Sequence, residues 1–109
     1  MKFPFALAVL LCATFLPPVQ AAEENDDAEF KKVADEYTKG WLAAHPLDAT
    51  SIGLHEYDGR INDYSRLALD AELSRLRRFD ERLKKFDPEK LNGTAAIDLG
   101  ILQTAVKHD

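Results

Sequence analysis

Between Ser65 and Phe86 an apolar side chain recurs every three or four residues, a spacing that places these side chains on one face of an α-helix. The stripe consists of Leu69, Leu73, Leu76, Phe79, Leu83 and Phe86. The opposite face is charged, and acid–base pairs at the spacing that favours ion pairing along a helix are Asp80 with Lys84 and Glu81 with Lys85. The sequence therefore predicts a long amphipathic helix that buries its stripe against other helices.

A second periodic segment runs from about Asp27 to Ala44. Its apolar face carries Phe30, Val33, Tyr37, Trp41 and Ala44. We expect Asp26 or Asp27 to cap the start of this helix, because an acidic side chain accepts from the free backbone N–H groups there. Pro46 should end it, since the residue before a proline avoids the helical region.

A third helix is expected from Thr94, its predicted N-cap, through Val106. No glycine or proline follows its last apolar residue, and the sequence ends at Asp109. We therefore expect this helix to be incomplete and the chain to be a truncated part of a larger domain.

The predicted fold class is all-α: two long amphipathic helices and an incomplete third, joined by a packed irregular loop over residues 47–64. This connection is long for a helical hairpin. We expect it to pack against the helices through its apolar side chains, which are Ile52, Leu54, Tyr57, Ile61 and Tyr64.

The amino terminus has the order of a secretory signal peptide over residues 1–21. Lys2 precedes an uncharged apolar run, and small side chains predict cleavage between Ala21 and Ala22. The run is shorter than the roughly 20 apolar residues that a transmembrane helix needs. We expect a periplasmic or secreted protein comprising residues 22–109, without stable membrane insertion after cleavage.

The net charge of the chain limits the classes of macromolecule that it can bind. The formal net charge is −5, whereas binding to a phosphate backbone requires clustered Lys and Arg. The densest basic cluster contains Arg75, Arg77 and Arg78, and the acidic residues Asp80 and Glu81 follow it after Phe79. We interpret it as a solvated helix face and expect no nucleic-acid partner.

The sequence contains no complete catalytic motif. His55 and Glu56 begin like the His-Glu-x-x-His zinc motif, but that motif needs a second histidine four residues after the first, where this chain has Gly59. No serine has the glycine-flanked setting of a hydrolase nucleophile. We therefore assign no catalytic residue, no metal ligand and no cofactor to this chain.

The segment that begins at Pro46 resembles the start of the bacterial family called domain of unknown function 885. The matching residues are Pro46, Ala49, Thr50, Gly53, His55, Tyr57, Asp58, Arg60, Asp63 and Ser65. Ile97-Asp98 and Leu102-Gln103 are similar to the family's continuation, so the resemblance covers essentially all of residues 22–109. It implies a longer, mostly helical, zinc-metallopeptidase-like protein, whose His-Glu-x-x-His helix lies far downstream and is absent here.

Two functions from different classes follow. The first is the amino-terminal part of such an exported protein, inactive by itself, with the missing carboxy-terminal part of the domain as its partner and zinc held only in full-length relatives. The alternative is a self-contained periplasmic helical binding or adaptor module. Within the connection, His55, Tyr57, Asp58 and Arg60 either line a substrate cleft or brace the loop, with Asp58 pairing Arg60 and His55 capping a helix.

Overall fold

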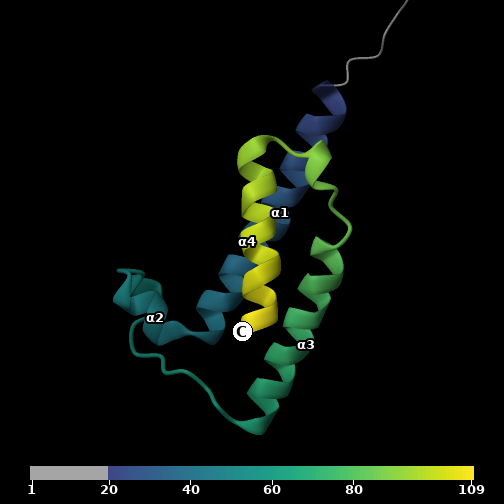
Figure 1. The fold of residues 1–109 in the computed structure, drawn as a ribbon. Helices are drawn as coiled ribbons and strands as arrows, with labels where there is room; N and C mark the ends of the chain where they lie inside the picture. Colours follow the sequence, from purple (N-terminus) through teal and green to yellow (C-terminus); the bar gives the residue numbers. More distant parts are fainter. Residues whose placement is uncertain (1–19) are drawn as a thin grey trace, which may run out of the picture.

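The computed structural model describes residues 20–109, with side chains from Asn25 onward. The predicted signal peptide lies outside the described residues except for Gln20 and Ala21. Three long helices, α1 (Gln20–Ala44), α3 (Arg66–Leu83) and α4 (Gly93–His108), lie side by side in Figure 1. The shorter elements are α2 (Pro46–Ser51) and the 3₁₀ turns η1 (His55–Tyr57) and η2 (Pro88–Lys90). No strand occurs in this part of the chain, so the predicted all-α class is confirmed.

The predicted apolar face of α1 is confirmed, with Phe30, Val33 and Tyr37 all buried. The predicted start of this helix is wrong. The helix begins at Gln20, because the residues before Asp26 are mostly alanine and glutamate, which favour helix. Asp26 and Asp27 therefore lie inside the helix and cannot cap its first turn.

The stripe of α3 is buried over only half of its length. Leu76, Phe79 and Leu83 are in the core, whereas Leu69 and Leu73 are 50% and 47% exposed. The two predicted stripes cover each other through edge-to-face aromatic pairs, in which the ring centroids of Tyr37 and Phe79 are 5.5 Å apart. Phe30 and Phe86 form a second pair at 5.5 Å.

The ends of α3 differ slightly from those predicted. Ser65 caps the helix, because its hydroxyl accepts from the backbone N–H of Ala68 at 3.2 Å. The helix ends at Leu83, and Phe86 lies beyond it. Of the predicted ion pairs, Lys84 with Asp80 is present at 2.6 Å. The second is wrong, since Glu81 also pairs with Lys84, at 3.0 Å, instead of Lys85.

The cap of α4 is Asn92, and the prediction of Thr94 is wrong. The Asn92 side chain accepts from the backbone N–H of Ala95 at 2.9 Å. Asp27 of α1 fixes this residue by accepting from its backbone N–H at 2.9 Å and from its side-chain amide at 2.5 Å. From this start, α4 places Leu99 and Val106 in the core between α1 and α3.

The connection between α1 and α3 is neither irregular throughout nor packed as predicted. It contains α2 and η1, with left-handed turns at Gly53 (φ +90°) and Gly59 (φ +78°), where a side chain would be strained. In Figure 1 it swings away from the three long helices. Ile52, Ile61 and Tyr64 consequently find little cover and are 69%, 79% and 72% exposed, whereas Leu54 and Tyr57 are half-buried.

Polar contacts tie the two ends of this connection together. The Asn62 side chain accepts from the backbone N–H of Leu47 at 3.2 Å and donates to the Tyr64 hydroxyl at 3.1 Å.

Within residues 20–109, no helix combines the length and the apolar character that crossing a membrane requires.

Candidate functional site

The four loop residues singled out from the sequence form two local contacts. His55 Nδ1 lies 3.1 Å from a carboxylate oxygen of Asp58. The guanidinium of Arg60 lies over the Tyr57 ring, 5.5 Å from its centroid. The predicted pair of Asp58 with Arg60 is wrong, because Asp58 pairs with His55 and Arg60 packs on Tyr57. Both observed pairs join residues three positions apart.

The environment of this loop cluster limits its chemistry. The side chains of His55 and Asp58 are 83% and 53% exposed, and an ion pair so open to water contributes little stability. A histidine with a carboxylate partner can act as a general base only where a nucleophile lies within reach. Within the described part of the chain, neither His55 nor Asp58 has a hydrogen bond to a serine, a threonine or a third ionisable group.

The resemblance implies zinc only on a His-Glu-x-x-His helix that lies outside this chain. In the described range, no group of three or more His, Cys, Asp and Glu side chains converges on a position for a metal ion, whereas catalytic zinc is held by three protein ligands. No metal-dependent step is derived for this chain.

The predicted cleavage residues Ala21 and Ala22 lie in the first turn of α1, and their side chains are not described.

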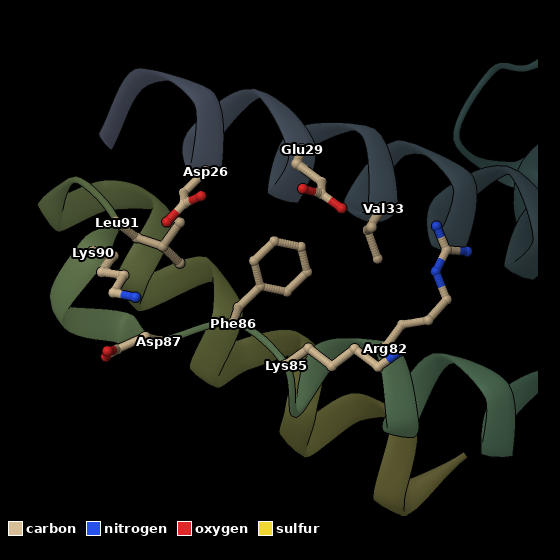
Figure 2. A pocket seen from close by; sticks show the side chains of 9 residues that line it. All are labelled: Asp26, Glu29, Val33, Arg82, Lys85, Phe86, Asp87, Lys90 and Leu91. Carbon is tan, nitrogen blue, oxygen red and sulfur yellow. The ribbon is translucent and has the colours of Figure 1, made fainter. Parts of the chain in front are cut away.

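A cavity of about 360 Å³ lies between the amino-terminal half of α1 and the segment from the end of α3 to Leu91 (Figure 2). Val33, Phe86 and Leu91 supply its apolar surface. Acidic and basic side chains surround this surface in equal number, namely Asp26, Glu29 and Asp87 with Arg82, Lys85 and Lys90. No motif in the sequence indicates this site, because its two sides come from segments that are 49 or more positions apart.

Arg75 is predicted to lie on a solvated helix face, but most of its side chain is buried in the structure. Its side chain is only 15% exposed and donates two hydrogen bonds to Glu72, at 2.7 and 2.6 Å. It also packs over the rings of Tyr37 and Phe79, 5.3 and 5.4 Å from their centroids. The interpretation of the basic cluster as a solvated face is therefore wrong for Arg75, although Arg77 is exposed as expected.

Two signals in the sequence pointed to this arrangement. Arg75 stands four residues before Phe79 and therefore shares its side of the helix. Gly40 interrupts a helix of otherwise good helix formers, and the structure shows why: a Cβ at this position would lie 2.7 Å from the Arg75 guanidinium. The glycine thus makes room for the arginine between α1 and α3.

Burial and hydrogen bonding change the proton affinity of the groups around Arg75. Burial, together with the hydrogen bond from the Tyr37 hydroxyl to Asp109 at 2.6 Å, raises the pKa of Tyr37. The hydrogen bonds to Glu72 raise the pKa of Arg75 further above its usual value. The raised pKa values keep the Tyr37 hydroxyl neutral and the Arg75 guanidinium charged near neutral pH.

Comparison of the chain with models of protein families, with curated proteins and with solved structures finds no match.

Proposed function

We propose that this chain is the amino-terminal helical part of an exported, zinc-metallopeptidase-like protein, and that it has no catalytic activity by itself. The observation that carries the proposal is the character of α4, which is apolar on the side that faces solvent as well as on the side that faces the core. The resemblance of residues 46–65 to the start of domain of unknown function 885 supports the same assignment.

The outer face of α4 consists of Ile97, Gly100, Ile101 and Thr104. Ile97 and Ile101 are 66% and 61% exposed, although Leu99 on the inner face is only 2% exposed. The ionisable side chains of the whole helix are Asp98, Lys107 and His108. Large apolar side chains on the outer as well as the inner face of a helix favour protein on both sides, so this face suits a covering helix.

The exposed part of the α3 stripe adds to this apolar surface. Leu69 and Leu73 line a groove of about 350 Å³ between α3 and the end of α4, together with Leu76 and Val106. Exposed apolar patches of this kind mark interaction sites in soluble proteins. We assign the carboxy-terminal part of the same domain as the partner that covers α4 and the groove.

In this proposal the chain supplies a helical support, and the zinc ligands belong to the carboxy-terminal part. His55, Tyr57, Asp58 and Arg60 then face the cleft only when that part is present. Export through the predicted signal peptide would place the protein in the periplasm or outside the cell.

The test is to read the coding DNA beyond the codon for Asp109 and to express what it encodes together with this chain. We expect a reading frame with further amphipathic helices and a His-Glu-x-x-His motif, and a product that co-purifies with this chain. Unrelated sequence after a stop codon, with no such frame, would contradict the proposal and favour a self-contained binding module.

A further inference from the structure

Asn92 joins the start of α4 to the first half of α1, and the two helices lie side by side there in Figure 1. Its backbone N–H donates to one carboxylate oxygen of Asp27 at 2.9 Å, and its side-chain amide donates to the other at 2.5 Å. These two hydrogen bonds form a latch between α1 and α4. The side-chain oxygen of Asn92 accepts from the backbone N–H of Ala95 at 2.9 Å and caps α4.

The residue that follows Asn92 makes its side-chain amide reactive. Glycine has no side chain to hinder approach, so the backbone nitrogen of Gly93 can attack the side-chain carbonyl carbon of Asn92. A bond forms between these two atoms, and the side-chain nitrogen leaves as ammonia with the proton of the Gly93 N–H. Water then opens the cyclic imide to give aspartate or isoaspartate. Asn25 and Asn62 are each followed by aspartate, so Asn92 is the one asparagine of the sequence in this setting.

The fold holds this reaction back. The carbonyl carbon of Asn92 must turn toward the Gly93 nitrogen, and turning breaks the hydrogen bonds of the side-chain amide to Asp27 and Ala95. Asn92 and Gly93 are nevertheless exposed, so water reaches them as soon as the latch opens. Opening a few exposed hydrogen bonds takes less free energy than unfolding the whole chain.

We propose that Asn92 is a site of spontaneous deamidation and that the latch to Asp27 sets its rate. The product cannot close the latch again, because it lacks the amide donor and places a second carboxylate against Asp27. An aspartate at this position still caps α4, since aspartate and asparagine are equally good caps. The loss therefore falls on the contact between α1 and α4. The proposal is independent of the proposed function, because it uses none of the surfaces assigned to the carboxy-terminal part.

The rate of deamidation tests the role of the latch. The purified full chain is kept at mildly alkaline pH, and mass spectrometry of its peptides follows Asn92, with Asn62 as the internal reference. We expect the reaction at Asn92 to be at least about tenfold slower in the folded chain than in urea. Asp27→Ala removes the latch and should accelerate the reaction in the folded chain about fivefold or more.

Two controls separate the latch from general effects. Asp26→Ala removes the same charge from the neighbouring position and keeps the latch, whereas Tyr37→Phe weakens the fold at the other end of α4. Both rates should stay within about twofold of the original rate, and circular dichroism verifies that the variants remain helical. No reaction at Asn92 in urea would overturn the proposal, as would equal rates in the folded chain and in urea. A rate in Asp27→Ala no higher than in the two controls would do so as well.

The consequence of the modification is tested with Asn92→Asp, which reproduces one product. We expect the equilibrium constant for folding, measured by urea unfolding, to fall about tenfold, as for loss of a hydrogen bond to a charged group. Adding Asp27→Asn exchanges donor and acceptor, because the new amide donates to the carboxylate at position 92 and still accepts from its backbone N–H. The double variant should therefore be more stable than either single variant. A double variant no more stable than Asn92→Asp, or an Asn92→Asp variant as stable as the original chain, would contradict the proposal.

Discussion

Replacing Gly40 by alanine tests the packing of Arg75 between α1 and α3. In a helix interior this change alone stabilises a protein by about 0.5–1 kcal/mol, because alanine loses less backbone entropy on folding. At this site, however, the new Cβ would lie 2.7 Å from a guanidinium nitrogen of Arg75 and 3.2 Å from its Cδ and Cζ atoms. Arg75 cannot move away freely, because Glu72 holds it by two hydrogen bonds.

The two effects have opposite signs, and the magnitudes decide between them. Introducing a methyl group into a filled space costs about 1–3 kcal/mol, which exceeds the helix-propensity gain. We expect Gly40→Ala to destabilise the chain by about 1 kcal/mol. In an Arg75→Ala background the obstruction is gone, and Gly40→Ala should then stabilise by about 0.5–1 kcal/mol, so the coupling between the two sites is about 1.5–2 kcal/mol.

Urea unfolding followed by circular dichroism measures these free energies. Gly100→Ala is the matched control, since Gly100 lies inside α4 with no atom within 4 Å of the added Cβ, and it should stabilise by about 0.5–1 kcal/mol in either background. If Gly40→Ala stabilises the original chain as much as Gly100→Ala does, the reasoning is refuted.

Three further predictions, made with five substitutions, test separate contacts in the same unfolding assay. Tyr37→Phe should cost about 0.5–1.5 kcal/mol, the usual value of one hydrogen bond. The pKa of Tyr37 is raised in the fold. The stability that depends on its neutral hydroxyl is therefore present below about pH 10, the pKa of an unfolded tyrosine, and is lost at higher pH. Between about pH 8 and about pH 11 the original chain should consequently lose more stability than Tyr37→Phe. Asn92→Ala should cost about 1–2 kcal/mol through loss of the α4 cap, and Thr94→Ala should cost less than about 0.5 kcal/mol; equal costs would contradict the assignment of the cap. Leu99→Ala should cost about 2–5 kcal/mol because Leu99 is buried in the core, whereas Ile101→Ala on the exposed outer face of α4 should cost less than about 1 kcal/mol.

The helices were predictable because their periodicity is local. The spacing of Phe30, Val33 and Tyr37 on α1, and of Leu76 and Phe79 on α3, dictates which faces meet, and these residues are buried in the structure. The sequence also shows where the long helices must end, before Pro46 and before Pro88. The fold class therefore follows from short-range patterns alone.

The errors concern features that depend on distant residues. Asn92 caps α4 in preference to Thr94 because Asp27, which is 65 positions away, holds it in place. Arg75 is buried because Gly40 of another helix leaves room for it. The contact between Asp27 and Asn92 leaves no signal in the sequence, and the glycine inside α1 becomes informative only once the structure shows that Arg75 fills the space beside it.

The same distinction between local patterns and contacts of distant residues applies to the candidate site. The loop residues His55 to Arg60 attract notice as a motif, yet their contacts in the structure are short-range and exposed. The charged cavity has no motif, since α1 and the segment after α3 contribute its two walls separately. The outer face of α4 was predictable as apolar, but its exposure depends on how the other helices are placed.

The central claim is that a further part of the same domain covers the outer face of α4. Its most direct test measures the rate of thiol labelling at Ile101→Cys and at the exposed control Lys39→Cys on α1. Both rates are measured first in this chain alone and then in its complex with the product of the downstream coding sequence. The one natural cysteine, Cys12, lies in the predicted signal peptide and is replaced by serine in both variants. The account predicts rapid labelling at both positions in the chain alone and at least tenfold slower labelling at Ile101→Cys, but not at Lys39→Cys, in the complex. Unchanged labelling at Ile101→Cys in the complex would contradict it.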